Sequence, residues 1–199
     1  MNSIVCIGDS LTYGYGVSTK SSWVELLRKK LNNVNVINAG VNGDTTIGMV
    51  NRFTEDVVYN NPDIVVILGG TNDFLTNKSA ENALKNIKIM VKETIENNII
   101  PIILAPQKTI EDLALKCWDS YCDYSKVNSL IEQFGEVLNT FCHNEGIDFI
   151  NLNYIFEKIE NNRYLYTDGI HLSEEGNKLL FEAVFNIIKK KVIIHYSSS

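Results

Sequence analysis

Apolar residues are grouped in this chain into short runs that are separated by longer, mixed stretches. The short runs cover residues 4–8, 34–37, 64–68, 99–104 and 147–150. Glycine, asparagine, proline or aspartate follows or precedes these runs, and a short apolar run with such boundaries is typical of a buried strand in a parallel sheet. The pattern therefore predicts five strands.

Between the runs, apolar residues recur every three or four positions, as they do on the buried face of a helix. This spacing predicts helices over residues 23–31, from Thr45, over 84–95, over 130–141 and after Ser173. Ser21 or Ser22 is expected to cap the first of them. Strands that alternate with helices predict a parallel sheet with helices on both faces. Two connections show no clean period, residues 105–123 and 151–167, and the first is the longest.

The length and composition indicate one domain. A chain of 199 residues with 45% hydrophobic content can bury a sizeable core. We predict a single domain over residues 1–196 and a short serine tail over 197–199. The net charge of −6 argues against a nucleic-acid partner, because binding to phosphates needs clustered Lys and Arg.

The start of the chain enters a strand directly and lacks the pattern of a secretory signal. No apolar run approaches the ~20 residues that span a bilayer. We therefore predict a cytoplasmic protein without a membrane span, although a secreted chain trimmed of its signal would look the same. The four cysteines are expected to be free thiols, and the Cys117–Cys122 spacing is not that of a zinc ribbon, so no metal or cofactor is expected. The oligomeric state stays open.

Three of the predicted strands are followed by small polar turns, which carry Ser10, Gly43 and Asn72. The carboxyl ends of parallel strands meet at one edge of the sheet, where ligands bind in α/β proteins. We therefore expect these three turns to lie close together. A hydroxyl nucleophile, a base and donors for an oxyanion are the groups that acyl transfer requires.

His171 is the best candidate for the base. Of the other two histidines, His195 lies near the end of the chain and His143 lies at the end of a helix. Asp168, three residues before His171, can hold the imidazole in one tautomer. Other interpretations exist for each feature alone, since Asp168 and His171 could be a surface pair and Gly43 could serve only a positive φ. The conjunction of four turns favours catalysis.

The blocks at residues 8–11, 38–45, 69–73 and 168–172 resemble the four blocks of the SGNH (GDSL) hydrolase family, in the same order along the chain. The resemblance implies a flavodoxin-like three-layer α/β/α sandwich with a five-stranded parallel sheet. It also implies that Ser10 is the nucleophile, His171 the base and Asp168 the carboxylate that orients it. The oxyanion hole would consist of the backbone N–H groups of Ser10 and Gly43 and the side-chain amide of Asn72.

The second block is similar to that of the thioesterase, lysophospholipase and arylesterase branch of the family. The segment 107–123 departs from that branch, which leaves the substrate open. Trp118, Tyr121 and Tyr124 could line a substrate pocket beside the triad, or they could simply pack this connection onto the sheet. If they line a pocket, short to medium acyl groups are expected.

Three functions are compatible with these features. The favoured one is an esterase or lipase-type hydrolase that cleaves carboxylic ester or thioester bonds through an acyl-serine. The second is a carbohydrate O-deacetylase of the same fold. The third is a flavodoxin-like ligand-binding module without catalysis, although its first turn has no Lys or Arg to hold a phosphate.

Overall fold

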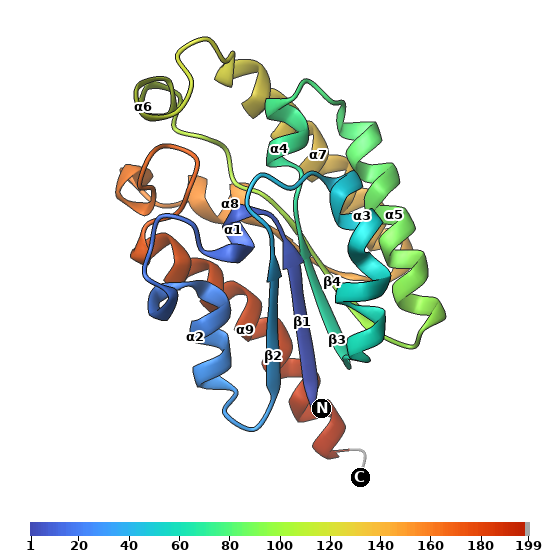
Figure 1. Ribbon diagram of the computed structural model, residues 1–199. Helices are drawn as coiled ribbons and strands as arrows, with labels where there is room; N and C mark the ends of the chain where they lie inside the picture. The colour runs from blue at the N-terminus through green and yellow to red at the C-terminus, as the bar shows by residue number, and fades with distance from the viewer. Residues whose placement is uncertain (198–199) are drawn as a thin grey trace.

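A computed structural model describes residues 1–197, with side chains to residue 191. Helices cover both faces of a central sheet, so that the molecule has three layers (Figure 1). Of the predicted tail, residues 198 and 199 lie outside the described residues, and Ser197 is the last residue of the final helix.

The described residues contain one sheet of five parallel strands in the order β2-β1-β3-β4-β5. This is the flavodoxin-like order, and it confirms the predicted fold class. The strands are β1 (Ser3–Gly8), β2 (Asn35–Gly40), β3 (Ile64–Leu68), β4 (Ile100–Ala105) and β5 (Asp148–Asn151). Each of the five predicted apolar runs is a strand, within a few residues at the ends.

Alternate residues of the strands face two separate cores. On β1, Ile4 and Cys6 belong to the core under α2 (Trp23–Lys30), α8 (Leu152–Glu157) and α9 (Glu174–Ser197). Val5 and Ile7 belong to the core on the other face. That face is covered by α3 (Thr46–Asp56), α5 (Ala80–Glu96) and α7 (Tyr124–Glu145). Both faces of β1 are fully buried, as the apolar run predicted.

Short helices occupy the connections at the carboxyl edge of the sheet. They are α1 (Ser10–Tyr13), α4 (Thr71–Leu75) and α6 (Glu111–Cys117). The 3-10 turns η1 (Thr19–Ser21) and η3 (Asn162–Leu165) lie in two of these connections, whereas η2 (Val58–Asn60) leads into the start of β3 at the opposite edge. The segment 105–123, expected to be irregular, thus contains α6. This helix buries only Ala114, so it has no apolar stripe by which the sequence could reveal it. Similarly, α8 and η3 interrupt the second connection, 151–167.

Three further expectations need correction. Strand β2 continues to Gly40, because Asn38, Ala39 and Gly40 pair with β1 in register instead of forming a turn. Ser22 precedes α2, but its hydroxyl donates to the carbonyl of Thr19 and does not cap the helix. Ile47 belongs to the apolar spacing that predicts a helix from Thr45, but it is 49% exposed and does not lie on the buried face of α3.

The first turn of α1 packs tightly against the neighbouring strand. A Cβ atom at Gly8 would collide with the Thr12 side chain and with the carbonyl oxygen of Leu68 in β3. Glycine at this position lets the chain turn directly from β1 into α1. The turns that follow β1 and β3 therefore lie side by side, at the point where the strand order reverses and where α/β proteins bind ligands.

Candidate active site

Ser10 is the first residue of α1 and follows the end of β1. The Asp9 carboxylate caps this helix by accepting a hydrogen bond of 2.9 Å from the backbone N–H of Leu11. The serine hydroxyl lies 3.0 Å from Nε2 of His171. Ser10 thus has a potential base within hydrogen-bond distance.

His171 is held on its other side by Asp168. Its Nδ1 lies 2.7 Å from Oδ2 of Asp168, while Oδ1 accepts from the backbone N–H groups of Ile170 and His171. An N–H at Nδ1 donates to the carboxylate, which leaves Nε2 as an acceptor for the Ser10 hydroxyl. The arrangement is that of a hydroxyl, an imidazole and an orienting carboxylate in line.

Asp168 is kept ionised by its hydrogen bonds. Burial acts to raise its pKa, but the bonds from the His171 ring and from the two backbone N–H groups together outweigh burial. The pKa of this carboxyl therefore lies below its ordinary value, as expected for a group that stabilises an imidazolium.

Two aromatic rings flank the imidazole of His171. The Tyr15 ring centroid lies 4.4 Å from it, and the Trp118 ring centroid lies 5.0 Å from it. The two rings also contact each other edge to face, with their centroids 6.0 Å apart. The histidine thus has little freedom to rotate, and Tyr15 and Trp118 shield it from water.

The three residues predicted to supply oxyanion donors, Ser10, Gly43 and Asn72, line one cavity with His171. Gly43 has a φ of 76°, which favours glycine. Among the described residues, the backbone N–H groups of Ser10 and Gly43 donate to no other group. The amide of Asn72 donates to the Asp44 carbonyl at 2.9 Å and, more weakly, to Oδ2 of Asp9 at 3.4 Å. The contact with Asp9 is long for a hydrogen bond, so the N–H that makes it is only weakly engaged.

The loop that carries Gly43 is fixed by Arg52 of α3. The guanidinium donates to Oδ2 of Asp44 at 2.8 Å, to the Ala39 carbonyl at 2.8 Å and to the Gly8 carbonyl at 2.9 Å. It also forms an ion pair with Asp56. One side chain thus ties the ends of β1 and β2 to the Gly43 loop, which the planar fork of arginine is suited to do.

Asp9 is a buried carboxyl group beside the candidate oxyanion hole. It is 0% exposed, and burial raises its pKa to about 7, against the opposing effect of the bond from Leu11. The sequence indicated Asp9 only as part of the first block and did not reveal this burial, which depends on the packing of three neighbouring loops.

The cavity itself has a volume of about 250 Å³. It is lined by the predicted residues Ser10, Gly43, Asn72, Trp118 and His171, and by Tyr15, Asn42, Leu75 and Ile170, which the sequence did not single out. Leu75 follows Asn72 by three positions on α4, and Ile170 directly precedes His171. Their positions in or next to the sequence blocks could have indicated that they lie near the site. Tyr15 carried no such signal, because its contact with His171 arises only on folding.

Of the three aromatic residues predicted to bind substrate, the structure brings only Trp118 to the cavity. Tyr121 is 97% exposed and does not line it. Tyr124 is buried at the start of α7, where it packs with Ala114 and Ile170. The connection therefore has both of the predicted roles, lining a pocket and packing the chain. Trp118 lines the cavity, and Tyr124 packs the α6 segment against the block that carries His171.

Within residues 1–191, no group of three or more His, Cys, Asp and Glu side chains is placed to hold a metal ion. No helix in the part of the chain that the structure describes is both long enough and apolar enough to cross a membrane.

Comparison with known families identifies relatives. A family model described as "GDSL-like Lipase/Acylhydrolase family" matches residues 6–179. Esterase TesA of Pseudomonas aeruginosa is 30% identical over 95 residues, and this match spans 46% of the chain and 47% of that protein. The chain thus spans about half the length of this relative. A bovine protein named isoamyl acetate-hydrolyzing esterase 1 homolog is 24% identical, over 95% of the chain and 82% of its own length.

Solved structures resemble the chain over nearly its whole length. The lipase/acylhydrolase from Enterococcus faecalis superposes with a TM-score of 0.80 at 26% identity, covering 96% of this chain and 97% of that one. A structure of TesA superposes with a TM-score of 0.75 at 24% identity, which shows a common fold.

Proposed function

Because the chain belongs to the GDSL-like lipase/acylhydrolase family, we propose that it hydrolyses carboxylic ester or thioester bonds through an acyl-serine intermediate at Ser10. The observation that carries this proposal is the continuous hydrogen-bonded chain from Ser10 through His171 to Asp168, beside a cavity. Several relatives are themselves named as esterases, which supports the same reaction class.

In the first half of the reaction, Ser10 Oγ attacks the carbonyl carbon while its proton passes to Nε2 of His171. The oxyanion that forms accepts hydrogen bonds from the N–H groups of Ser10 and Gly43 and from the amide of Asn72. His171 then gives the proton to the leaving oxygen or sulfur, and the acyl group stays on Ser10. Asp168 stabilises the imidazolium throughout.

In the second half, a water molecule takes the position of the leaving group. His171 accepts a proton from this water, and the hydroxide adds to the acyl carbon. The tetrahedral intermediate collapses, the acid leaves and Ser10 regains its proton from His171. No cofactor enters these steps.

The size of the cavity supports short to medium acyl groups. Its volume of about 250 Å³ is smaller than most pockets that enclose a drug-sized ligand. Leu75, Trp118 and Ile170 contribute apolar surface to its lining.

Labelling tests the proposal directly. A fluorophosphonate should modify one residue, Ser10, as identified by peptide mass, and the Ser10→Ala variant should not react. In parallel, p-nitrophenyl esters and acyl-CoAs of increasing chain length should be hydrolysed by the natural chain but not by Ser10→Ala. Labelling at another residue, or turnover by Ser10→Ala, would contradict the proposal.

A further inference from the structure

Asp73 directly follows Asn72 on α4 and binds Thr46, the first residue of α3. Its Oδ2 accepts from the backbone N–H of Thr46 at 2.8 Å, and its Oδ1 accepts from the Thr46 hydroxyl at 2.6 Å. The N–H groups in the first turn of a helix have no partner within the helix, and a carboxylate placed there satisfies one of them. The Asp73 side chain thus joins α4 to the start of α3.

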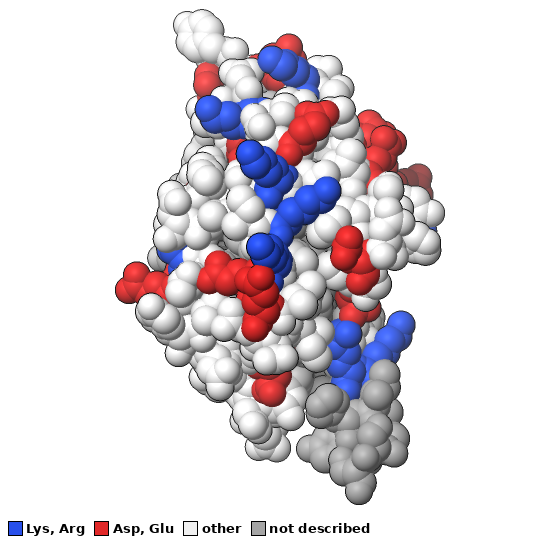
Figure 2. All heavy atoms as spheres, turned by 90° about the vertical axis from the view of Figure 1, so that its right-hand side faces the viewer, with Lys and Arg blue, Asp and Glu red and all other residues white. Residues whose placement is uncertain are grey.

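Both members of this pair are buried. Asp73 is 2% exposed and Thr46 is 0% exposed. Acidic and basic side chains are spread over the outer face of α3 and α5 that Figure 2 shows, but Asp73 is too buried to belong to these surface charges. Asn86 of α5 donates to the Thr46 hydroxyl at 2.9 Å, so a third element holds the pair in place. Because little water reaches them, the two hydrogen bonds of Asp73 are stronger than such bonds at the surface.

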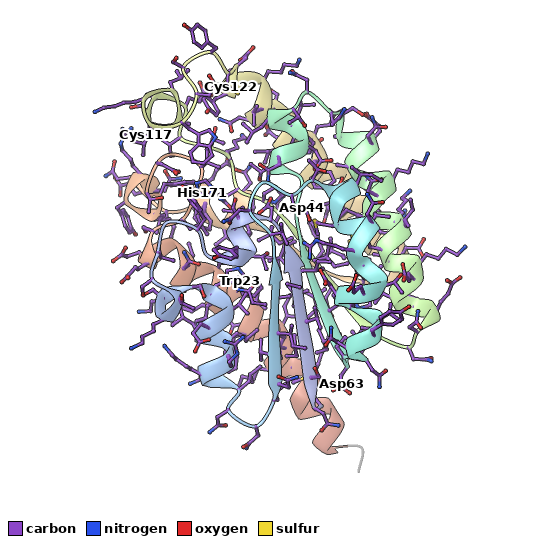
Figure 3. The ribbon with its side chains drawn as sticks, in the orientation of Figure 1. Trp23, Asp44, Asp63, Cys117, Cys122 and His171 are labelled. Carbon is purple, nitrogen blue, oxygen red and sulfur yellow. The ribbon has the colours of Figure 1, made fainter. Side chains whose placement is uncertain are left out.

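The pair connects two segments that carry candidate oxyanion donors. Gly43 precedes Thr46 by three residues, and Asn72 directly precedes Asp73. The Asn72 amide adds a third bond between the segments, because it donates to the Asp44 carbonyl at 2.9 Å. Figure 3 shows Asp44 at the ends of the central strands, near the start of α3. The distance between the two candidate donors therefore depends on these three bonds.

The position of the donors matters because an oxyanion hole requires them to converge on one oxygen atom, at about 2.7–3.1 Å from it. A displacement of about 1 Å can lower the rate on the order of 10²-fold. The bonds of Arg52 tie the Gly43 loop to the ends of β1 and β2. The link from this loop to α4 comes from Asp73, together with the Asn72 amide.

We propose that Asp73 is a positioning residue, which holds Thr46 and thereby sets the distance between the Gly43 N–H and the Asn72 amide. It acts through these two donors, and it is not one of the described residues that line the cavity at Ser10. This inference rests on the hydrolase function proposed for Ser10 and on the donor roles proposed for Gly43 and Asn72.

Two substitutions of Asp73 separate its hydrogen bonds from its charge. Asp73→Asn can keep both contacts, since its oxygen accepts from the Thr46 N–H and its amide donates to the Thr46 hydroxyl. It should lower kcat on p-nitrophenyl acetate by no more than about threefold. Asp73→Ala loses both contacts and should lower kcat about 10- to 100-fold, with KM nearly unchanged. The kcat values are expressed per Ser10 that a fluorophosphonate labels, so that unfolded protein is not counted.

Thr46→Val tests the pair from its other side and keeps the test open if Asp73→Ala does not fold. It removes the hydroxyl but leaves the backbone N–H, so kcat should fall about 3- to 10-fold. Thr94→Val is the matched control, because Thr94 is also 0% exposed and its hydroxyl donates to the Met90 carbonyl at 2.7 Å. The control should lose thermal stability without a change in kcat.

A transition-state analogue gives a measurement that a purely structural role would not change. Butyl trifluoromethyl ketone is expected to bond to Ser10 Oγ, while its carbonyl oxygen becomes an oxyanion and the serine proton passes to His171. The inhibition constant therefore reports on the oxyanion donors. It should rise in Asp73→Ala and Thr46→Val by about the factor by which kcat falls, and it should stay constant in Thr94→Val.

Unchanged kcat and inhibition constants in Asp73→Ala and Thr46→Val would overturn the inference. Equal losses in Asp73→Asn and Asp73→Ala would also overturn it, because the charge and not the pair of contacts would then be required. Absence of a fluorophosphonate label at Ser10 in the natural chain would instead refute the hydrolase function, and the inference with it.

Discussion

Ser10, His171 and Asp168 form one hydrogen-bonded chain, so we expect them to act as a unit. Ser10→Ala and His171→Ala should each lower kcat by about 10⁴- to 10⁶-fold, and the double variant should lose little more. Asp168→Asn should cost somewhat less, because the serine and the imidazole remain. Single-turnover kinetics on an activated ester measure these values. Additive losses in the double variant would show that the two residues act separately.

Asn72 differs from the triad, because its amide is proposed to bind charge that exists only in the transition state. Asn72→Ala should lower kcat by roughly 10²- to 10³-fold and leave KM nearly unchanged. The side chain also bonds the Asp44 carbonyl, so circular dichroism must show that the variant is folded. A tenfold rise in KM with kcat intact would make Asn72 a residue that binds the ground state.

At the scale of elements, helix α6 controls one wall of the cavity. The segment is joined to the His171 block by a hydrogen bond of 2.8 Å from the N–H of Ile110 to the carbonyl of Gly169. It also packs through Ala114 onto Ile170. Trp118, the residue that directly follows this helix, thereby reaches the His171 ring.

Removal of this wall should change the chain-length preference. Trp118→Ala should move the optimum toward longer acyl groups, since each further buried CH₂ contributes about 0.8 kcal/mol to binding. Tyr121→Ala is the matched control, because Tyr121 belongs to the same connection but is 97% exposed. A series of p-nitrophenyl esters measures both profiles. An unchanged profile in Trp118→Ala, with lower thermal stability, would mean that the tryptophan has a structural role only.

For the molecule as a whole, the buried Asp9 links stability to pH. Its pKa is about 7 in the folded chain, against an ordinary value of 3.8. As pH rises from about 4 to 7, the unfolded chain loses this proton and the folded chain keeps it. The unfolded state binds fewer protons there, so stability falls with rising pH, by on the order of 4 kcal/mol in total. Above pH 7 both states are ionised and the effect is constant.

Replacement of Asp9 should therefore stabilise the chain at neutral pH. Asp9→Asn keeps an acceptor for the N–H of Leu11 but places an amide near that of Asn72, so we expect a net gain of roughly 1–3 kcal/mol at pH 8. The gain should shrink toward pH 4, as measured by urea unfolding across this range. The exposed Glu160→Gln serves as control. A difference between Asp9→Asn and the natural chain that does not vary with pH would contradict the burial effect.

The sequence by itself determined the fold class and which residues form the motifs. Strand β3, for example, runs over Ile64–Leu68 as predicted. A short apolar run between turn-forming residues favours a buried strand, whatever the position of that strand in the sheet. The blocks around Ser10, Asn72 and His171 are likewise local, and the parallel topology alone places the first two at one edge. The structure brings all three to one cavity, while their catalytic roles remain a proposal.

Only the tertiary structure decided which other side chains reach that edge. Tyr15 and Trp118 contact His171, whereas Tyr121, three residues after Trp118, points to solvent. The raised pKa of Asp9 also depends on groups that follow different strands, because Asp44, Asp73 and His171 lie near it. Burial and proximity of this kind are properties of packed surfaces, and residues far apart in the chain carry no periodic signal that could predict them.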